Sequence, residues 1–499
     1  MEHDVVVVGS GAGALVGAYR AASLGLRTVV LEKTAVVGGT SAYSGGSMYL
    51  PGNHVSQAAG HDDTVERGRT YLEGVIGPGD ARREAFLTTA AEVVGFLDAH
   101  PRMELIATPI PEYFDAPGRW PGGAQIGPAM LPASEVDPDV LALVRDTITN
   151  DRLGTHPERA ELWGGQSLIT RLLLAFTEAG GEVRTGHCVD RLVLADGRVI
   201  GVEAQTSEGR VTVRGARGVL LASGGFERNP VLRERYGVPG DAAFSMAPAG
   251  TNTGEPIEAA MAVGAAVDLM DEGWFCPGLH EPDGGAGFFM GLRGGVFVNA
   301  QGERFANESL PYDRMGREMA KLSPEAWFVF DSRERGRPPG VRCVPGTRRD
   351  AFLASGDWVE RETLEELAAA TGVPADALAA TVDRWNGFCV AGVDEDFGRG
   401  EDEFDRYFAF GDPPNPCLVP LDRPPYVAAR VVLGDLGTKG GLVTDADARV
   451  LRADGSVIPG LFAAGNSMAS IAGAFYPAPG TPIGTAVVFA YRAASSLST

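Results

Sequence analysis

Near the start of the chain, the hydrophobic positions follow two different periods in succession. Residues 4–8 (Asp-Val-Val-Val-Val) form a β-branched run, which is typical of a strand buried on both faces in a parallel sheet. Small and apolar residues then recur at helical spacing from Ala14 to Ala22, and Gly25 can end that helix. A second β-branched run covers residues 28–31. The pattern predicts a β-α-β unit of about thirty residues.

Similar signals recur towards the other end of the chain. Residues 219–222 and 461–464 are short apolar runs that lead into glycine-rich turns, and they predict two further strands. Apolar residues at helical spacing from Ala486 to Ala493 predict a last helix, with Pro482 in its first turn, where an N–H is not needed. This helix presents a second N-terminus that can face a ligand.

The middle of the chain is more irregular. Residues 275–430 are rich in Pro and Gly, and one clear amphipathic stretch, residues 364–378, interrupts them. Neither an internal repeat nor a low-complexity segment is present. The sequence therefore predicts sheet-forming segments at both ends, with a different kind of structure inserted between them.

The turn between the first strand and the first helix carries a dinucleotide-binding fingerprint. Gly9 allows the tight turn, Gly11 lets the backbone approach a pyrophosphate, and Ala14 occupies the third position, where the helix packs on the strand. The helix N-terminus, which includes Gly13, offers unpaired N–H groups to phosphates. Glu32, at the tip of the second strand, can accept hydrogen bonds from ribose hydroxyls and disfavours the 2′-phosphate of NADP. The fingerprint predicts a site for FAD or NAD.

A second glycine-rich loop, residues 38–46, favours FAD over NAD. Its sequence is Gly-Gly-Thr-Ser-Ala-Tyr-Ser-Gly-Gly. A loop this rich in backbone N–H groups and hydroxyls suits the second phosphate and the flavin side of FAD. The residues expected to contribute are Gly39, Thr40, Ser41, Ser44, Gly45 and Gly46.

Composition and charge narrow the classes of partner. The 499 residues are 44% hydrophobic and 22% charged, which fits a globular chain of two domains. A net charge of −22 makes nucleic acid and anionic membrane surfaces unfavourable partners. The N-terminus has no basic region before its apolar run, and no stretch is apolar for long enough to span a membrane. A cytoplasmic location is therefore expected.

The cysteines do not indicate a structural or metal-binding role. Cys188, Cys276, Cys343, Cys389 and Cys417 are odd in number and far apart, and no C-x-x-C motif occurs. A disulfide framework, an iron–sulfur cluster and attached haem are therefore not expected, and no metal site is predicted.

Together these motifs resemble the FAD-dependent succinate dehydrogenase/fumarate reductase flavoprotein superfamily, and within it most closely the 3-ketosteroid Δ1-dehydrogenases. The resemblance covers nearly the whole chain and is more specific to the superfamily than to the substrate. The matching segments are residues 4–13, 38–46, 222–225, 304–312, 439–466 and 475–484. The resemblance implies an α/β fold class: a Rossmann-like FAD-binding domain with a parallel sheet (residues 1–272 and 432–499) and an inserted α+β catalytic domain that caps the substrate (residues 273–431).

The resemblance also implies which residues bind the cofactor and that the binding is non-covalent. His54 follows the flavin loop, but members of this family hold FAD without a covalent bond, so attachment at His54 is not expected. The expected cofactor-binding residues are Gly9, Gly11, Gly13, Ala14, Glu32, Lys33, Gly39, Thr40, Ser41, Ser44, Gly45, Gly46, Val189, Ala222, Ser223, Gly224, Gly465, Asn466 and Ile483.

In this family a hydride leaves C1 of the steroid A ring for the flavin, and a tyrosine takes a proton from C2. The C2 proton becomes removable only if the developing oxyanion on the 3-keto group is stabilised. Tyr476 and Gly480 match the tyrosine hydroxyl and the glycine N–H that bind this ketone. The two prolines between them donate no N–H, which leaves Gly480 as the natural donor.

Tyr312 matches the tyrosine that takes the proton. A phenol with an unperturbed pKa of about 10 is a poor base at neutral pH, so it needs either a second hydroxyl or a lowered pKa. The resemblance implies that a further tyrosine from the flavin domain assists it. Tyr113 is the candidate for that assistance, and Tyr43 and Tyr49 are held in reserve. For each of these tyrosines, packing without proton transfer is the alternative.

The leading hypothesis is 1,2-desaturation of a 3-ketosteroid, with electrons passing to an external acceptor such as a quinone. Open alternatives are 3-ketosteroid Δ4-(5α)-dehydrogenase, a flavin-dependent desaturase or ene-reductase of another cyclic ketone such as a terpenoid or polyketide, and a non-redox flavoprotein. Reduction of a small dicarboxylate is disfavoured because no histidine follows His280. Arg293 and Arg304 remain in the insertion, and Arg304 can pair with a carboxylate of its own segment. The oligomeric state and a transient membrane contact are left open.

Overall fold

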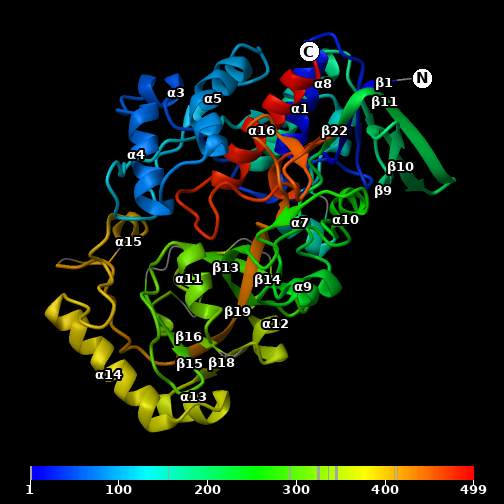
Figure 1. The fold of residues 1–499 in the computed structure, drawn as a ribbon. Coiled ribbons are helices and arrows are strands. Elements are labelled where there is room, and N and C mark those ends of the chain that lie inside the picture. Colours follow the sequence, from blue (N-terminus) through cyan, green and yellow to red (C-terminus); the bar gives the residue numbers. More distant parts are fainter. Residues whose placement is uncertain are drawn as a thin grey trace. The chain divides into compact units, whose positions relative to one another are not determined.

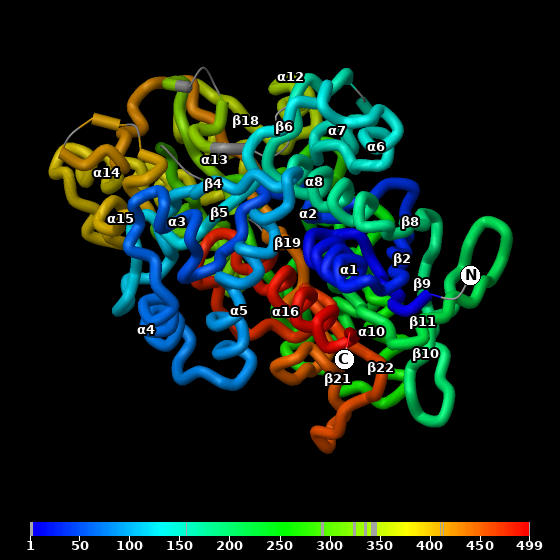
Figure 2. Tube along the Cα trace, turned by 90° about the horizontal axis from the view of Figure 1, so that it is seen from above, coloured from blue at the N-terminus to red at the C-terminus, as the bar shows by residue number. Residues whose placement is uncertain are grey.

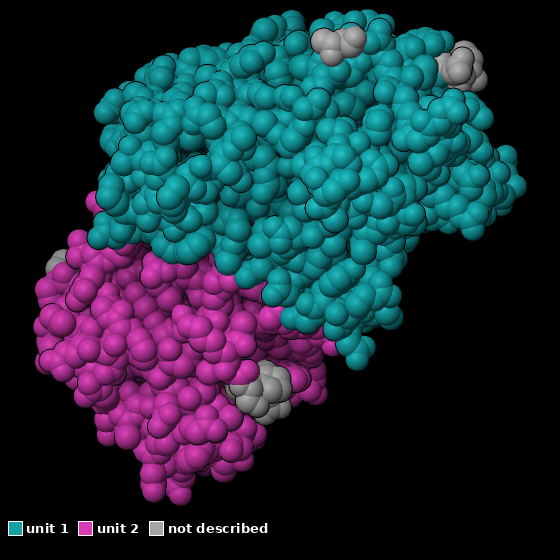
Figure 3. All heavy atoms as spheres, in the orientation of Figure 1, with its two compact units in different colours: residues 1–238, 247–273, 437–499 teal, residues 239–246, 274–436 magenta. Residues whose placement is uncertain are grey.

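The structure is a computed structural model that describes residues 3–155, 157–290, 294–322, 326–334, 337–342, 347–409, 411–412 and 414–498. The chain divides into two compact units, which Figure 3 draws in different colours. Unit 1 comprises Met1–Val238, Ala247–Gly273 and Gly437–Thr499. Unit 2 comprises Pro239–Met246 and Trp274–Leu436.

The two units differ in part from the domain boundaries expected from the sequence, which put residues 1–272 and 432–499 in the first domain: Gly273 lies in unit 1, residues 432–436 lie in unit 2, and a longer segment also departs. Pro239–Met246 belongs to unit 2. The Met246 N–H donates to the Asp435 carbonyl at 2.8 Å, and the Ser245 hydroxyl donates to the Asp435 carboxylate at 2.8 Å. These bonds join two segments far apart in the sequence, and no local pattern indicates them.

The centre of unit 1 is an eight-stranded sheet of order β21-β22-β11-β1-β2-β8, which β9 and β10 extend (Figure 1). The pairs from β22 through β8 are parallel, whereas β21 and the β9-β10 extension pair antiparallel. The strands are β1 (His3–Val8), β2 (Thr28–Leu31), β8 (Glu182–Arg184), β9 (Cys188–Ala195), β10 (Arg198–Thr206), β11 (Gly209–Leu221), β21 (Arg449–Leu451) and β22 (Val457–Ala463).

The register of the parallel strands brings their carboxyl ends to one edge. Val8 at the end of β1 pairs with Leu31 of β2 and with Leu221 of β11, and Leu221 pairs with Ala463 of β22. In an open α/β sheet, ligands bind outside the carboxyl ends of the strands. The glycine-rich turns that follow β1, β11 and β22 therefore meet at the edge where a cofactor is expected.

The first and last helices of the chain lie side by side in unit 1 (Figures 1 and 2). A Cβ atom added to Gly13 of α1 would lie 2.9 Å from the Cβ of Ala486 in α16, so only glycine permits this approach. The helices of unit 1 are α1 (Ala12–Ser23), α2 (Gly39–Tyr43), α3 (His54–Ala58), α4 (Val65–Ile76), α5 (Ala81–Asp98), α6 (Pro138–Leu143), α7 (Ile148–Leu153), α8 (Gly164–Glu178), α9 (Pro230–Tyr236), α10 (Glu255–Ala262) and α16 (Thr481–Leu497).

Smaller elements complete unit 1. A three-stranded sheet has the order β3-β5-β4, and two further pairs are β6 with β7 and β12 with β20. These strands are β3 (Met48–Tyr49), β4 (Leu105–Ala107), β5 (Gln125–Pro128), β6 (Leu131–Pro132), β7 (Glu161–Leu162), β12 (Val267–Asp268) and β20 (Gly441–Leu442); the short 3₁₀ turns are η1 (Ala133–Glu135) and η4 (Gly465–Ser467).

Unit 2 is built on a seven-stranded sheet of order β15-β16-β19-β13-β14-β17, with β18 also paired to β19. Its strands are β13 (Gly273–His280), β14 (Ala286–Met290), β15 (Val296–Asn299), β16 (Ala326–Phe330), β17 (Val341–Arg342), β18 (Trp358–Arg361) and β19 (Tyr426–Thr438). Its helices are α11 (Tyr312–Met319), α12 (Arg349–Ser355), α13 (Leu364–Thr371), α14 (Ala375–Ala391) and α15 (Glu403–Tyr407), with 3₁₀ turns η2 (Ala242–Phe244) and η3 (Ser332–Glu334).

Alternating side chains place helices on both faces of this sheet. Phe297 and Phe328 lie in one apolar cluster with residues of α11 and α12, whereas Val298 and Val329 lie in another with residues of α13 and α14. The amphipathic stretch expected over residues 364–378 proves to be two helices. Gly372, with φ +78°, ends α13, and α14 begins three residues later, at Ala375. Among the described residues, no helix has the length and apolarity that crossing a bilayer requires.

Candidate active site

The turn after β1 fits the backbone of a dinucleotide site. Gly9 has φ +99°, and a Cβ there would lie 2.5 Å from the Ala222 carbonyl oxygen, so a larger residue cannot occupy this turn. The Ala12 N–H donates to the Ser41 hydroxyl at 3.1 Å. In the described part of the chain, no acceptor takes a hydrogen bond from the N–H groups of Gly11, Gly13 or Ala14. Unpaired donors at a helix N-terminus are the feature with which proteins commonly bind phosphate.

Glu32 links the two glycine-rich loops. Its buried carboxylate accepts hydrogen bonds from the Ser10 hydroxyl at 2.5 Å and from the Thr34 N–H at 2.8 Å. The Ser10 hydroxyl in turn accepts from the Gly38 N–H at 3.0 Å. The Thr34 hydroxyl is the third donor, at 2.9 Å. Because a carboxylate accepts about four hydrogen bonds, these three donors leave room for another.

The second loop is shaped by close backbone contacts. Gly46 has φ +74°, and a Cβ on it would lie 2.6 Å from the carbonyl carbon of Gly164. A Cβ on Gly164 would in turn lie 3.0 Å from the carbonyl carbon of Gly45. The Ser44 hydroxyl accepts from the Gly46 N–H at 3.0 Å. The Thr40 hydroxyl accepts from the Asn252 side chain at 3.3 Å. Gly39 begins the short helix α2 with φ +48°. The loop therefore needs glycine for its path.

The turns after β11 and β22 meet at the same edge. The Ser467 hydroxyl accepts from the Ser223 N–H at 3.0 Å and donates to the Gly224 carbonyl at 2.9 Å. Gly465 and Asn466 lie in η4, where a Cβ on Gly465 would be 3.3 Å from the Cβ of Ala486. In the first turn of α16, the Ile483 N–H has no acceptor among the described residues. The turns that carry these expected cofactor residues thus meet at the carboxyl edge of the unit 1 sheet.

Two expected cofactor residues lie less directly at this edge. The Lys33 ammonium forms an ion pair with Glu255 at 2.8 Å and donates to the Thr253 hydroxyl at 2.5 Å. Its positive charge is therefore already paired with a carboxylate of the chain. Val189 is buried in β9. The Glu32 carbonyl accepts from the His187 N–H, which holds the start of β9 next to Glu32.

The loop of residues 474–480 carries the expected ketone-binding pair, the Tyr476 hydroxyl and the Gly480 N–H. Tyr476 is buried, and its ring lies edge-on to the Tyr113 ring with 5.4 Å between the centroids. Gly480 has φ +79°, and a Cβ there would lie 2.7 Å from the Ser47 carbonyl oxygen. In the described residues, no acceptor takes a hydrogen bond from the Gly480 N–H. This N–H is therefore available to a ligand oxygen.

Buried donors from three separate segments of the chain bind the carbonyl groups of this loop. The Lys439 ammonium donates to the carbonyls of Ala474 at 3.0 Å and Phe475 at 2.9 Å. The Tyr71 hydroxyl donates to the Pro477 carbonyl at 2.6 Å, and the Tyr49 N–H donates to the Gly480 carbonyl at 3.1 Å. The loop is held on both sides of Tyr476, which fixes the backbone that presents its hydroxyl.

Glu112 is a buried acid beside Tyr113 that the sequence analysis did not single out. Its carboxyl accepts from the Tyr49 hydroxyl at 3.0 Å and from the Trp120 N–H at 2.8 Å. Burial raises the pKa of Glu112 to about 7, against the partial opposition of these hydrogen bonds. Its only signal in the sequence is its place next to Tyr113.

The two reserve tyrosines, Tyr43 and Tyr49, donate their hydroxyl protons to carboxyl groups. The Tyr49 hydroxyl donates to Glu112, and the Tyr43 hydroxyl donates to Asp151 at 2.6 Å. Burial, followed by the neighbouring carboxylate, raises the pKa of both phenols above their ordinary value. Both groups are therefore structural donors, and Tyr113 stays the candidate for assisting proton transfer.

Tyr312 lies in unit 2 as the first residue of α11, and its side chain is buried. Its ring packs edge-on to Phe288, with 5.1 Å between the centroids. The next residue, Asp313, accepts from the Phe275 N–H at 3.2 Å and from Arg317 at 3.0 Å. The start of α11, and with it the Tyr312 backbone, is thereby fixed within unit 2.

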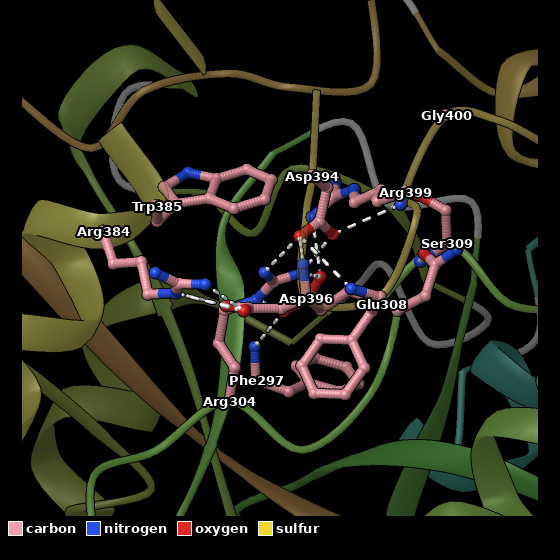
Figure 4. A network of polar contacts seen from close by, with 12 residues as sticks. Phe297, Arg304, Glu308, Ser309, Arg384, Trp385, Asp394, Asp396, Arg399 and Gly400 are labelled. Atoms are coloured by element: carbon pink, nitrogen blue, oxygen red, sulfur yellow. Dashed lines mark hydrogen bonds and ion pairs between the residues drawn. The ribbon is translucent and has the colours of Figure 1, made fainter. Parts of the chain in front are cut away.

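The segment before Tyr312 is held by a buried ion-pair network (Figure 4). Arg304 donates to both carboxylate oxygens of Glu308 at 2.8 Å and to both of Asp394 at 3.0 Å. Arg399 donates to Glu308 at 3.2 Å, and both guanidinium groups lie over the Trp385 ring. Arg304 is thus occupied by carboxylates of the chain, which argues against its use for a dicarboxylate substrate.

Comparison with known proteins decides the family. The chain matches the FAD binding domain family over residues 4–483. It is 38% identical to the 3-oxosteroid 1-dehydrogenase of Mycobacterium tuberculosis, over 99% of this chain and 98% of that protein. The chain belongs to the FAD-binding family of the 3-oxosteroid 1-dehydrogenases. This result confirms the resemblance stated from the motifs.

The chain is also similar to two further proteins, one of known structure and one that acts on a different ketone by its name. The crystal structure of 3-ketosteroid Δ1-dehydrogenase from Sterolibacterium denitrificans in complex with 1,4-androstadiene-3,17-dione has a TM-score of 0.91 and 33% identity, and the match covers 100% of this chain and 99% of that chain. The 4-oxocyclohexanecarboxylate 2-dehydrogenase of Sinomonas cyclohexanicum is 34% identical over 99% of this chain and 93% of that protein. The likeness to the crystal structure confirms the expected α/β fold class.

The other residues weighed in the sequence have ordinary partners in this family member. The His54 ring lies 2.8 Å from the Asp98 carboxylate at a half-exposed position, and the His280 ring lies 2.6 Å from Asp357 within unit 2. Burial raises the pKa of the Cys417 thiol to about 11, so it is not a thiolate near neutral pH. Cys343 and Arg293 lie outside the described residues.

Proposed function

We propose that the chain is an FAD-dependent dehydrogenase that introduces a C=C bond between C1 and C2 of a 3-ketosteroid. The observation that carries the proposal is the likeness, over the full length of both chains, to a Δ1-dehydrogenase with a bound steroid dienone. Unit 1 would bind FAD.

FAD would be held non-covalently at the carboxyl edge of the unit 1 sheet. The unpaired N–H groups of Gly11, Gly13 and Ala14 would bind the pyrophosphate, and Glu32 would accept from the ribose. The second loop, Lys33, Val189, the turn of Ala222, Ser223 and Gly224, the pair Gly465 and Asn466, and the Ile483 N–H would complete the site. When bound, FAD supplies the acceptor for the hydride that leaves C1.

The Tyr476 hydroxyl and the Gly480 N–H would both donate hydrogen bonds to the ketone oxygen. Their effect is to stabilise negative charge on that oxygen, which lowers the pKa of the adjacent C2 proton. The unpaired Gly480 N–H and the fixed carbonyls around it support this role, because a donor that needs no rearrangement stabilises the transition state most.

Tyr312 would take the proton from C2, and the Tyr113 hydroxyl would assist it. A phenol needs such assistance because its ordinary pKa of about 10 leaves little phenolate at neutral pH. The edge-on packing of Tyr113 on Tyr476 supports placing Tyr113 with the ketone-binding pair.

The substrate would be apolar. Phe475, beside Tyr476, is 39% exposed, and its ring packs edge-on to Phe114 at 6.0 Å. An exposed aromatic ring next to the ketone-binding pair suits a flat hydrocarbon skeleton. Desaturation of a smaller cyclic ketone is the second candidate, because a relative at 34% identity is named for 4-oxocyclohexanecarboxylate. Electrons would pass from the reduced flavin to an external acceptor, which we propose to be a quinone. The cytoplasmic location stays a prediction.

The test is turnover of a 4-ene-3-oxosteroid by the holoenzyme with an artificial electron acceptor. Mass spectrometry should give a product lighter by two hydrogens, and ring-A NMR should place the new double bond at C1–C2. A double bond elsewhere supports the Δ4-(5α) alternative. Turnover of 4-oxocyclohexanecarboxylate but of no steroid supports the second candidate and contradicts the proposal.

A further inference from the structure

Tyr71 is a buried tyrosine on α4 that none of the proposed roles uses. Its side chain is 0% exposed. Its hydroxyl donates to the Pro477 carbonyl at 2.6 Å and accepts from the Phe114 N–H at 3.2 Å. One hydroxyl therefore bonds both to the residue after Tyr476 and to the residue after Tyr113.

The Pro477 carbonyl receives a second donor from the same neighbourhood. The Tyr113 N–H donates to it at 2.9 Å. The backbones beside Tyr113 and Tyr476 are thus joined both directly and through the Tyr71 hydroxyl. The centroids of the Tyr113 and Tyr476 rings lie 5.4 Å apart. A shift of either backbone therefore moves one ring against the other.

The chemistry of Tyr71 suits a permanent donor and does not suit a base. Burial, followed by the charge of Glu112, raises the pKa of Tyr71 well above its ordinary value, and the Phe114 N–H and Arg119 oppose this only in part. The phenol keeps its proton across the working range of pH. Its hydrogen bond to Pro477 is therefore constant, as a fixed support requires.

We propose that Tyr71 is a positioning residue that sets the position and orientation of the Tyr476 hydroxyl relative to the ketone. The proposal rests on the proposed function, because positioning has meaning only if Tyr476 binds a ketone. Tyr71 itself touches neither substrate nor cofactor in this proposal. Lys439 holds the loop before Tyr476, and Tyr71 holds it after Tyr476.

The test compares Tyr71→Phe with Tyr491→Phe in the holoenzyme. Tyr491 is a matched control, since it is also buried and its hydroxyl donates to Glu92 at 2.7 Å. Tyr71→Phe should lower kcat by about 10- to 100-fold with KM changed by less than about threefold, because small misplacements act mainly on the reacting geometry. A substrate deuterated at C2 should show a larger isotope effect with Tyr71→Phe than with wild type. Tyr491→Phe should change neither quantity.

Equal kcat and equal isotope effects in the two variants and the wild type would overturn the positioning role while leaving the proposed function intact. A wild type that desaturates no ketone would overturn the proposed function and the positioning role with it. A measurement on the wild type alone covers the case in which Tyr71→Phe does not fold. Hydrogen exchange should show protected amides at Tyr113 and Phe114, and fast exchange at both would contradict the proposed hydrogen bonds.

Discussion

The phenolic oxygen of Tyr49 lies 3.0 Å from a carboxyl oxygen of Glu112, and both side chains are buried in unit 1. The acid lies directly before Tyr113 in the chain, and burial raises its pKa to about 7 from an ordinary value of 4.5. A carboxyl group next to the candidate site therefore changes charge near neutral pH.

This titration predicts how stability depends on pH. The folded state holds the Glu112 proton more tightly than the unfolded state, so stability falls as pH rises from about 4.5 to about 7. A shift of this size corresponds to about 3 kcal/mol. Glu112→Gln should remove the loss, so the variant should gain melting temperature relative to wild type as pH increases from 5 to 8. Glu73→Gln, at an exposed position on α4, is the control. Parallel melting curves for wild type and Glu112→Gln would contradict the prediction.

Gly480 and Gly473 provide a matched pair of substitutions in neighbouring turns. Both have positive φ, at +79° and +55°, so alanine costs each about 1–2 kcal/mol. Only at Gly480 does the new Cβ meet backbone, 2.7 Å from the Ser47 carbonyl oxygen, whereas Gly473 faces open space. Alanine keeps the N–H, but this clash shifts the backbone and moves the donor away from the ketone oxygen, so Gly480→Ala should lower kcat by up to about 100-fold, whereas Gly473→Ala should retain turnover. Steady-state kinetics on both variants would show the difference, and equal losses would argue against a ketone at Gly480.

Removal of the Tyr476 hydroxyl should have a comparable effect on chemistry. Tyr476→Phe keeps the packing against Tyr113 and deletes one donor to the ketone oxygen. The expected result is a fall in kcat of about 10²- to 10³-fold with normal FAD content. Tyr236→Phe is the control, because its hydroxyl contacts only the Met261 sulfur at 3.7 Å among the hydrogen bonds described. Unchanged turnover by Tyr476→Phe would remove this residue from the mechanism.

The ion-pair network of unit 2 predicts an effect on stability. Glu308→Gln leaves Arg304 and Arg399 with one carboxylate fewer in a buried site, which should cost about 3–5 kcal/mol. Glu318→Gln removes a surface partner of Lys321 and should cost no more than about 1 kcal/mol. Thermal unfolding of both variants would measure the difference, and similar melting temperatures would contradict the buried role of Glu308.

The parts of the fold that the sequence predicted are those set by local patterns. The β-branched runs, the helical spacing after Gly13 and the acid at Glu32 specify the first β-α-β unit within about thirty residues. The family motifs then extended the prediction to the whole chain. The α/β fold and the two-segment origin of the sheet followed from these signals.

The remaining features depend on contacts between residues far apart in the chain. The Tyr71 hydroxyl meets the Pro477 carbonyl across 406 positions of sequence, and nothing near Tyr71 announces that contact. The raised pKa of Glu112 depends on burial, which only the folded unit provides. The roles of Tyr113 and Tyr312 stay predictions, since each rests on a family match and not on an observed ligand.

Anaerobic titration of the purified holoenzyme with a 4-ene-3-oxosteroid shows whether the flavin itself takes the electrons of steroid desaturation. Desaturation delivers two electrons to the oxidised flavin, so its visible absorbance should bleach in proportion to added steroid, and the recovered steroid should be the 1,4-diene. An absorbance spectrum that stays oxidised across a panel of 3-ketosteroids would contradict the account.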